Sequence, residues 1–517
     1  MLFFYCLLPT ACRLSVRTIQ ELTATTIPAS PTAIAAFIAY LLLVIGIGVY
    51  ATRFSSAGVS EFFVGGRKMH RFVVALSAVV SGRSAWLLLG VTGMAYSIGA
   101  GAVWAVTGYI VVELALFLFY AGRLRRFGDV HDCVTMPDFF AARFGDRNGL
   151  LRGLLALVII VFMVSYVSAQ FVGGGKAFAA SFALEPDTGI LLTAAIVLAY
   201  TTLGGFLAVS LTDMLQAVLM MLALVLLPVI AIADRGGLSG VTAELAALDP
   251  TLIDPTALAA GVAIGFLGIG LGSPGNPHII VRYLSIEDAR QLRYAAMVGT
   301  IWNVVMAWGA LFVGLVGRAY FPDVALLPDA DTENLYPLLA QQHLPPILFG
   351  VVVASIFAAI MSTADSQLLV AASAVVRDVY EQVLRRGETI SQRRLVVYSR
   401  IVVVVLVAAA LAMGYLAETL VFWLVLFAWA GLGAALGPTS ILALFWKRTT
   451  RAGVMAGLLV GAGVTFVWEL TPSLEPLIYE LIPAFAAGAM ATVLVSLLTK
   501  APEGVDGMFD DMEERVQ

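Results

Sequence analysis

The chain has 517 residues, of which 60% are hydrophobic and only 12% are charged, and its mean hydropathy is +0.95. Soluble globular chains carry about 25% charged residues, so too few polar side chains are present to cover a water-facing surface of this size, and a membrane protein is predicted. The net charge of −4 argues against nucleic acid as a partner, and three scattered cysteines exclude a disulfide frame or a zinc site.

Apolar segments long enough to cross a bilayer follow one another along the chain, with no soluble linker between them. They predict an all-α polytopic protein with about thirteen transmembrane helices in one membrane domain, residues 32–498. The predicted helices are 32–52, 72–96, 100–121, 150–171, 188–205, 207–232, 256–273, 294–317, 346–375, 395–415, 419–446, 452–469 and 478–498.

The two ends of the chain lie outside this domain. Residues 1–31 hold a short apolar run followed by Arg13 and Arg17, which is the reverse of the order in a signal peptide. They are expected to be an extracytoplasmic segment or the product of a misassigned start. Residues 499–517 are expected to form a solvated, acidic cytoplasmic tail.

The basic residues predict the topology. Most of the 30 Lys and Arg residues fall in the connections after the odd-numbered segments and in the tail, and Arg282 is counted among them. Cytoplasmic loops collect Lys and Arg. The N-terminus is therefore expected outside and the C-terminus in the cytoplasm, which requires an odd number of crossings.

The second segment is interrupted by small residues and by Arg83, in residues 81–86. Small residues also occur in ordinary helix packing, but a charge in the middle of a membrane costs at least about 2.5 kcal/mol and needs a partner. Transporters place solutes and ions at interrupted helices near the bilayer midplane. The segment therefore predicts an unwound turn with a functional arginine.

The ninth segment carries Ser362, Thr363 and Asp365 on adjacent turns. Hydroxyl, carbonyl and carboxylate oxygens suit a hard cation such as sodium. Each hydroxyl has an alternative in a bond to its own helix carbonyl, but that alternative does not explain Asp365.

Three weaker signals accompany these two segments. Asp213, near the start of the sixth segment, is read equally well as a helix-start carboxylate or as a site residue. The Gly/Pro-rich residues 268–278 cannot hold a regular helix and form either a loop or a second break. Tyr166 and Gln170 share one face of the fourth segment.

In this order the motifs resemble the sodium/solute symporter family, and in particular sodium/proline symporters of the PutP type, over nearly all of the chain after about residue 40. The phrases that carry the resemblance are FFVGGRKMHRFVVALSA, TMPDFFAARF, TLGGFLAVSLTDMLQA, GNPHIIVRY, AAIMSTADSQLLVAASA and FAWAGLGAALGP.

The resemblance implies a LeuT-like fold in which segments 2–6 and 7–11 form two inverted five-helix repeats. It implies a secondary transporter in the bacterial inner membrane and not an enzyme. Sodium would be the coupling ion, no cofactor would be needed, and the substrate would be a small organic solute, an amino acid such as proline above all.

The resemblance also implies the site residues. The principal sodium site would use Val80, Arg83, Ala359, Ser362 and Thr363, and a second would use Asp213 with Ser362 and Thr363. Substrate contacts are expected from Ser84, Trp86, Tyr166, Gln170, Ile269 and Ser273.

The chain departs from the family pattern at two places. Gly82 stands where PutP-like transporters carry an aspartate, and Ile269 and Ser273 replace aromatic residues. Two mechanisms follow. In the first, sodium binds Ser362, Thr363 and backbone carbonyls with Asp213 or Asp365 supplying negative charge, and Arg83 points away and pairs with an acidic residue or the substrate carboxylate. In the second, Arg83 takes the place of the ion, pairs with Asp365 and makes uptake or exchange sodium-independent. A transporter-like membrane sensor is the third alternative.

Overall fold

The computed structural model describes residues 30–55, 59–416, 420–474 and 476–513, so most of the predicted N-terminal segment lies outside the described residues. The described chain is helical, and its only β-pairing is an isolated bridge between Met69 and Ile286. The α-helices are α2 (Pro31–Ser55), α3 (Val59–Val64), α4 (Arg71–Ser81), α5 (Thr92–Ile98), α6 (Val103–Ala115), α7 (Ala121–Val130), α8 (Met136–Phe144), α9 (Leu150–Phe182), α10 (Pro186–Asp234), α11 (Gly237–Leu248), α12 (Ala260–Leu267), α13 (Pro277–Ser285), α14 (Leu292–Tyr320), α15 (Leu335–His343), α16 (Pro346–Ser373), α17 (Gln392–Gly414), α18 (Val421–Phe445), α19 (Arg451–Glu469), α20 (Leu481–Leu498) and α21 (Val505–Met512).

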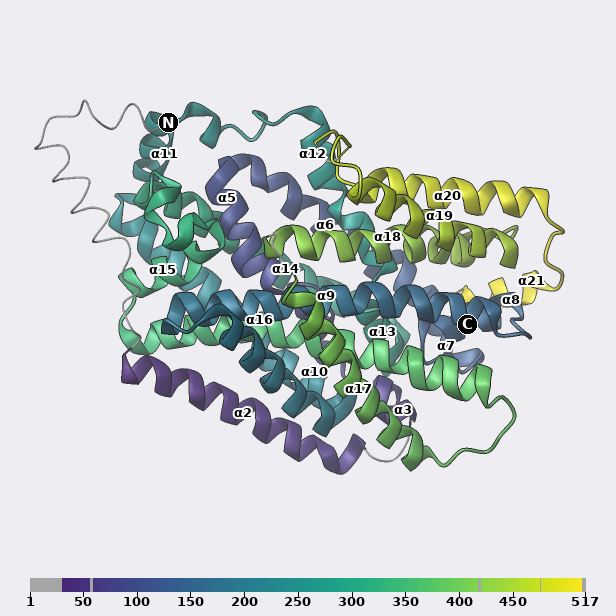
Figure 1. Cartoon of the computed structure of the whole chain (residues 1–517). Coiled ribbons are helices and arrows are strands. Elements are labelled where there is room, and N and C mark those ends of the chain that lie inside the picture. Colours follow the sequence, from purple (N-terminus) through teal and green to yellow (C-terminus); the bar gives the residue numbers. More distant parts are fainter. Residues whose placement is uncertain (1–29, 56–58, 417–419, 475, 514–517) are drawn as a thin grey trace, which may run out of the picture.

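The long helices lie side by side in one bundle (Figure 1). The most apolar stretches of α18 and of the run that begins with α16 are 83% buried, whereas those of α2 and α20 are 28% buried. Helices α16 and α18 therefore form the centre, and α2 and α20 present apolar side chains outward as lipid-facing helices do. Helices α11 and α15 lie at one end of the bundle, and α7, α8 and α21 lie at the other (Figure 1).

Among the described residues, ten helical runs are long and apolar enough to cross a membrane. The predicted count is higher because several predicted segments are divided. Arg71–Ser81 and Ala260–Gly275 are too short to count alone, and the run Trp86–Val130 joins parts of the second and third predicted segments.

Two of the divisions are the expected helix breaks. Helix α4 ends at Ser81, Gly82 adopts φ −95° and ψ 0°, and the chain resumes at Trp86–Val91 as a π-helical turn. A 3₁₀ run, Gly268–Gly275, follows α12, and Asn276 is extended before α13 starts. Pro277 suits the first position of α13 because it has no N–H to leave unpaired.

The fifth and sixth predicted segments are joined in α10, which turns sharply at Gly205. Gly205 has φ 59° and ψ −161°, a backbone conformation that is essentially restricted to glycine because other residues carry a Cβ. A single glycine, Gly205, therefore permits the sharp turn of α10.

At the end of the bundle near α15, residues 321–345, here called the end segment, connect α14 to α16. The ammonium of Lys176 on α9 lies 2.7 Å from Asp331 Oδ2 and 2.6 Å from Glu333 Oε2. The buried Glu333 carboxylate also accepts hydrogen bonds from the backbone N–H groups of Val421, at 3.0 Å, and Phe422, at 2.8 Å. Glu333 thereby caps the N-terminus of α18.

Within residues 505–512 of the acidic tail, the structure differs from the predicted solvated end. Residues Val505–Met512 form α21, and the side chains of Phe509 and Met512 are buried. Arg126 Nε donates to Met512 O at 3.0 Å, and Lys447 Nζ donates to Asp506 Oδ1 at 2.7 Å. The apolar residues of α21 form one face of the helix, and this face packs against α7. The many acidic residues around them made the face hard to recognise in the sequence.

Candidate functional site

The break after α4 is held by side chains from α9 and from the break itself. Gln170 Oε1 accepts a hydrogen bond from Ala85 N at 3.0 Å, and Trp86 N donates to Ser84 Oγ at 3.1 Å. The hydroxyls of Ser84 and Tyr166 are 3.5 Å apart. These contacts satisfy N–H groups that an interrupted helix frees inside a membrane. Three of the predicted substrate residues, Ser84, Tyr166 and Gln170, therefore meet at this break.

Three of the predicted sodium ligands, Val80, Ala359 and Ser362, also lie together, between the C-terminal end of α4 and the middle of α16, and Thr363 follows Ser362 on α16. Ser362 Oγ is 3.4 Å from Val80 O and 3.1 Å from Ala359 O. Thr363 is fully buried, and its hydroxyl has no hydrogen-bond partner within the described chain. The negative end of the α4 dipole adds to this group of oxygens, which is the donor set that a hard cation prefers.

The side chain of Arg83 is directed away from these oxygens, toward α6 and α14. Its Nε donates to Asn303 Oδ1 at 2.7 Å, its Nη1 donates to Gly82 O at 3.0 Å, and its Nη2 forms an ion pair with Glu113. The guanidinium carbon lies 3.8 Å from the centre of the Tyr109 ring. A buried charge in a membrane is thus matched by a carboxylate and an aromatic face.

The pairing of Arg83 with Asp365, which the ion-replacement mechanism requires, is not found in the structure. Asp365 Oδ2 accepts a hydrogen bond from Tyr200 Oη at 2.7 Å, and its Oδ1 accepts one from Ser366 Oγ at 3.0 Å. Glu113, on α6, is the acid that Arg83 reaches, whereas Asp365 faces Tyr200 on α10.

A second buried arginine overturns one topology assignment. Arg282, which the sequence placed in a cytoplasmic connection, is only 1% exposed, and its Nη2 lies 3.3 Å from Asp213 Oδ2. Its Nε donates to Ser77 Oγ at 3.1 Å. The helix resumes at α13 after the second break, and this continuation carries Arg282 back into the bundle between α4 and α10.

Asp213, which is predicted to take part in a second sodium site, lies beside this arginine in the structure. Its Oδ2 accepts hydrogen bonds from Ser77 Oγ at 2.6 Å and from Ser81 Oγ at 3.4 Å, and its charge is paired with Arg282. Neither Ser362 nor Thr363 bonds to it among the contacts of the described residues. A guanidinium supplies the cation that the Asp213 carboxylate needs.

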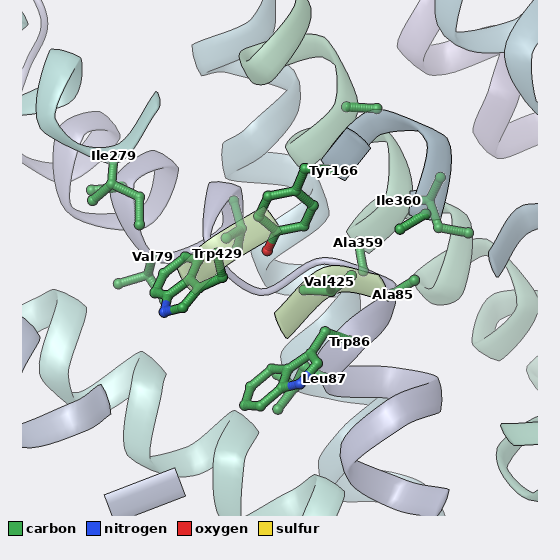
Figure 2. Close-up of a cluster of buried hydrophobic side chains, with 14 of the residues drawn as sticks. Val79, Ala85, Trp86, Leu87, Tyr166, Ile279, Ala359, Ile360, Val425 and Trp429 are labelled. Atoms are coloured by element: carbon green, nitrogen blue, oxygen red, sulfur yellow. The ribbon is translucent and has the colours of Figure 1, made fainter. Parts of the chain in front are cut away.

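A small cavity lies beside the first break. It is lined by residues of the break, α6, α9, the 3₁₀ run and α18, namely Gly82, Arg83, Trp86, Tyr109, Tyr166, Ile269, Val425, Leu426 and Trp429. Figure 2 shows Trp86, Tyr166 and Trp429 gathered around the interrupted helix. Trp429 Nε1 donates to Ile269 O at 2.7 Å, which fixes one wall. The walls are mainly aromatic and apolar, as small-molecule sites usually are.

Of the predicted substrate residues, Trp86, Tyr166 and Ile269 line this cavity, and the other three, Ser84, Gln170 and Ser273, do not. Ser273 Oγ instead donates to Glu113 Oε1 at 3.3 Å. The sequence prediction missed Glu113, although Glu113 is the only acidic residue of the third segment and the argument applied to Arg83 would have found it. Asn303 and Tyr109 gave no such signal, because single amide and phenol groups in apolar segments are common packing residues.

The comparisons with known sequences agree over most of the chain. Residues 62–461 match the model of the sodium:solute symporter family. The osmoregulated proline transporter OpuE of Bacillus subtilis (strain 168) is 36% identical and the alignment covers 90% of this chain and 94% of that protein. A sodium/proline symporter of Staphylococcus aureus (strain JH9) is 38% identical over 90% of this chain and 92% of its own length.

The fold agrees as well. A sodium-coupled sialic acid symporter in its outward-open state superposes with a TM-score of 0.77 at 18% identity, covering 91% of this chain and 99% of that one. The nucleobase-cation-symport-1 family transporter Mhp1 gives a TM-score of 0.53 at 14% identity, covering 88% and 99%. With the family model spanning most of the sequence and named transporters aligned almost end to end, the chain belongs to the sodium:solute symporter family and is a multi-pass membrane transporter, not an enzyme.

Proposed function

We propose that this protein couples the entry of sodium to the uptake of proline or a closely related amino acid across the bacterial inner membrane. The substrate comes from the relatives, which are named as proline transporters. The observation that supports a sodium site is the group of oxygens formed by Val80, Ala359 and Ser362 beside a broken helix, with the unpaired hydroxyl of Thr363 next to Ser362 in the chain.

In this mechanism sodium binds Ser362 Oγ, Thr363 Oγ1 and the backbone carbonyls of Val80, Arg83 and Ala359. Such an ion bridges α4, which ends at the first break, and α16, which lies at the centre of the bundle. An ion can drive transport only by favouring one conformation over another. Sodium at this position favours the arrangement in which the broken helix lies against α16, and it thereby orders the neighbouring solute cavity.

We also propose the topology that the basic residues predict, with about thirteen crossings, the N-terminus outside and the C-terminus in the cytoplasm. The end of the bundle that holds α11 and α15 would then face outward. The two breaks, after α4 and before α13, support two inverted five-helix repeats, because each repeat of such a transporter contributes one interrupted helix.

The ion-replacement alternative is not favoured by the contacts of Arg83, because its guanidinium is engaged by Glu113 and Asn303 on the side away from Ser362. Neither exchange without sodium nor a sensor role has an observation of its own in the described structure, so sodium-coupled uptake is the one function proposed.

The test is uptake of radiolabelled proline into proteoliposomes with and without an inward sodium gradient. Replacing either hydroxyl, by Ser362→Ala or Thr363→Ala, should raise the half-saturating sodium concentration about tenfold, since a hydrogen bond or ligand to a charge is worth roughly 1.5 kcal/mol or more. Ser373→Ala is the matched control, because Ser373 Oγ only bonds Val370 O of its own helix. Uptake that needs no sodium, or that keeps its sodium dependence in both variants, would show the ion site to be wrong.

A further inference from the structure

We propose that Arg83 receives the carboxylate of the transported solute, and that Glu113 and Asn303 are positioning residues that hold the guanidinium for this contact. The assignment rests on the proposed function and makes it more specific: the solute must carry a carboxylate, and a solute that is neutral overall is favoured.

The first argument is the position of Arg83. It forms part of the cavity wall at the break, beside Trp86 and Tyr166. A guanidinium has five N–H groups, and its contacts to Asn303, Gly82 and Glu113 engage three of them. The N–H groups that remain have no acceptor within the described part of the chain. A carboxylate is the acceptor that matches the planar guanidinium best.

The second argument is that both carboxylate oxygens of Glu113 accept hydrogen bonds from side chains that do not line the cavity. Its Oε2 accepts a hydrogen bond from Asn303 Nδ2 at 2.6 Å and faces Arg83, and its Oε1 accepts one from Ser273 Oγ at 3.3 Å. Glu113 is not among the residues that line the cavity. It therefore cancels the charge of Arg83 without occupying the place of a ligand. A zwitterionic amino acid adds no net charge to this neutral pair, whereas an unbalanced ion would raise the desolvation cost.

The third argument comes from polar atoms that lack partners. Trp86 Nε1 and Tyr109 Oη are buried, and neither has a hydrogen-bond partner among the described residues. Buried polar groups are nearly always paired. The indole N–H can only donate, so its missing partner is an acceptor. Both side chains line the same cavity as Arg83, and a solute carboxylate supplies the acceptor that these donors need.

Equilibrium binding of radiolabelled proline to the purified full chain in sodium buffer tests the assignment, with unlabelled proline and prolinamide as competitors. Prolinamide keeps the ring and the amine but has no carboxylate. The wild type should prefer proline by roughly 10- to 100-fold, the range of a charged hydrogen bond. Arg83→Lys keeps the charge but loses the planar fork, so this preference should fall by about tenfold with little change in prolinamide binding.

Glu113→Gln probes the positioning role with a side chain of the same shape. Without the counter-charge Arg83 becomes an unbalanced cation, so tetrahydro-2-furoate, a proline analogue with a carboxylate and no amine, should gain at least about tenfold relative to proline. Arg235→Gln is the control, since Arg235 pairs with Glu244 outside the site. A purely structural Arg83–Glu113 pair would weaken all ligands alike.

The outcomes separate the two ideas. If the wild type binds no proline, the proposed function and the assignment of Arg83 both fail. If it binds proline but both variants keep the wild-type ratios among the three ligands, only the assignment fails. Should Arg83→Lys not fold, the ratio measured in Glu113→Gln decides alone.

Discussion

Arg83 and Arg282 are each held in the membrane core by one carboxylate and several neutral oxygens. Arg83 pairs with Glu113 and bonds Asn303, and Arg282 pairs with Asp213 and bonds Ser77. Removing one member of such a pair leaves an uncompensated charge, whereas removing both is often tolerated.

The pair between Asp213 and Arg282 provides a prediction about stability. Asp213→Asn or Arg282→Met alone should lower the free energy of unfolding by about 3–5 kcal/mol, and the double variant should recover much of this loss. Thermal unfolding of the purified protein in detergent measures the difference. Additive losses in the double variant would show that the two side chains are not coupled.

A single sequence singles out those residues whose chemistry conflicts with their surroundings. Arg83, Ser362 and Thr363 stand out because charges or paired hydroxyls interrupt apolar segments, and their roles in the site remain a prediction. Arg282 was assigned wrongly, because the residues before Pro277 resemble a loop and nothing in the sequence says that the helix continues into the bundle beyond them. The partner of each arginine depends on helix packing, which a single sequence does not contain.

Among the helices, α10 changes direction at a single glycine. Because Gly205 has a positive φ and an extended ψ, a side chain there strains the backbone by roughly 1–3 kcal/mol. Gly205→Ala should therefore lower the unfolding temperature. Gly463→Ala is the control: Gly463 lies within α19 with open space around it, and alanine in a helix is favoured by up to about 1 kcal/mol. Equal effects of the two changes would contradict this account of the corner.

Helix α21 should depend on docking for its existence, since a helix of eight residues is marginal by itself. Phe509→Ala removes its largest buried side chain, which should cost about 2 kcal/mol of docking free energy and increase amide exchange in residues 505–512. Hydrogen exchange followed by mass spectrometry measures this, with Asp510→Asn, an exposed change on the same helix, as the control. Unchanged protection in the phenylalanine variant would mean that docking does not rest on this contact.

The ion pair between Lys447 and Asp506 of α21 should respond to salt rather than to moderate changes in pH. The bond with Lys447 lowers the pKa of Asp506, and Asp506 raises the pKa of Lys447. A lowered carboxyl pKa contributes stability that is present above the ordinary aspartate pKa and is lost only as the pH falls through the lowered value. Both charges persist near neutral pH, while salt screens exposed pairs. Amide protection in residues 505–512, taken relative to the intrinsic exchange rate at each pH, should therefore fall with ionic strength. In His131→Gln, which lacks the histidine partner of Asp511, this protection should stay flat from about pH 6 to 8.

For the molecule as a whole, hydropathy was a reliable guide to the fold class. The apolar segments correctly predicted a helical membrane protein, and their interruptions correctly predicted where helices break. The predicted count of crossings remains a proposal, because several segments are divided or fused in space. The docked α21 and the end segment could not be foreseen, since both depend on contacts between residues far apart in the sequence.

The carboxylate of Glu333 has a consequence for how the transporter can open. It binds the ammonium of Lys176 and at the same time the first N–H groups of α18, so three parts of the chain share one anchor. If this end is to open, Glu333 must release the first N–H groups of α18 and its share of Lys176, whose ammonium keeps only Asp331 as an acceptor among the contacts described. Partly open conformations are then high in free energy. We therefore expect this end of the protein to switch between two discrete conformations instead of opening gradually.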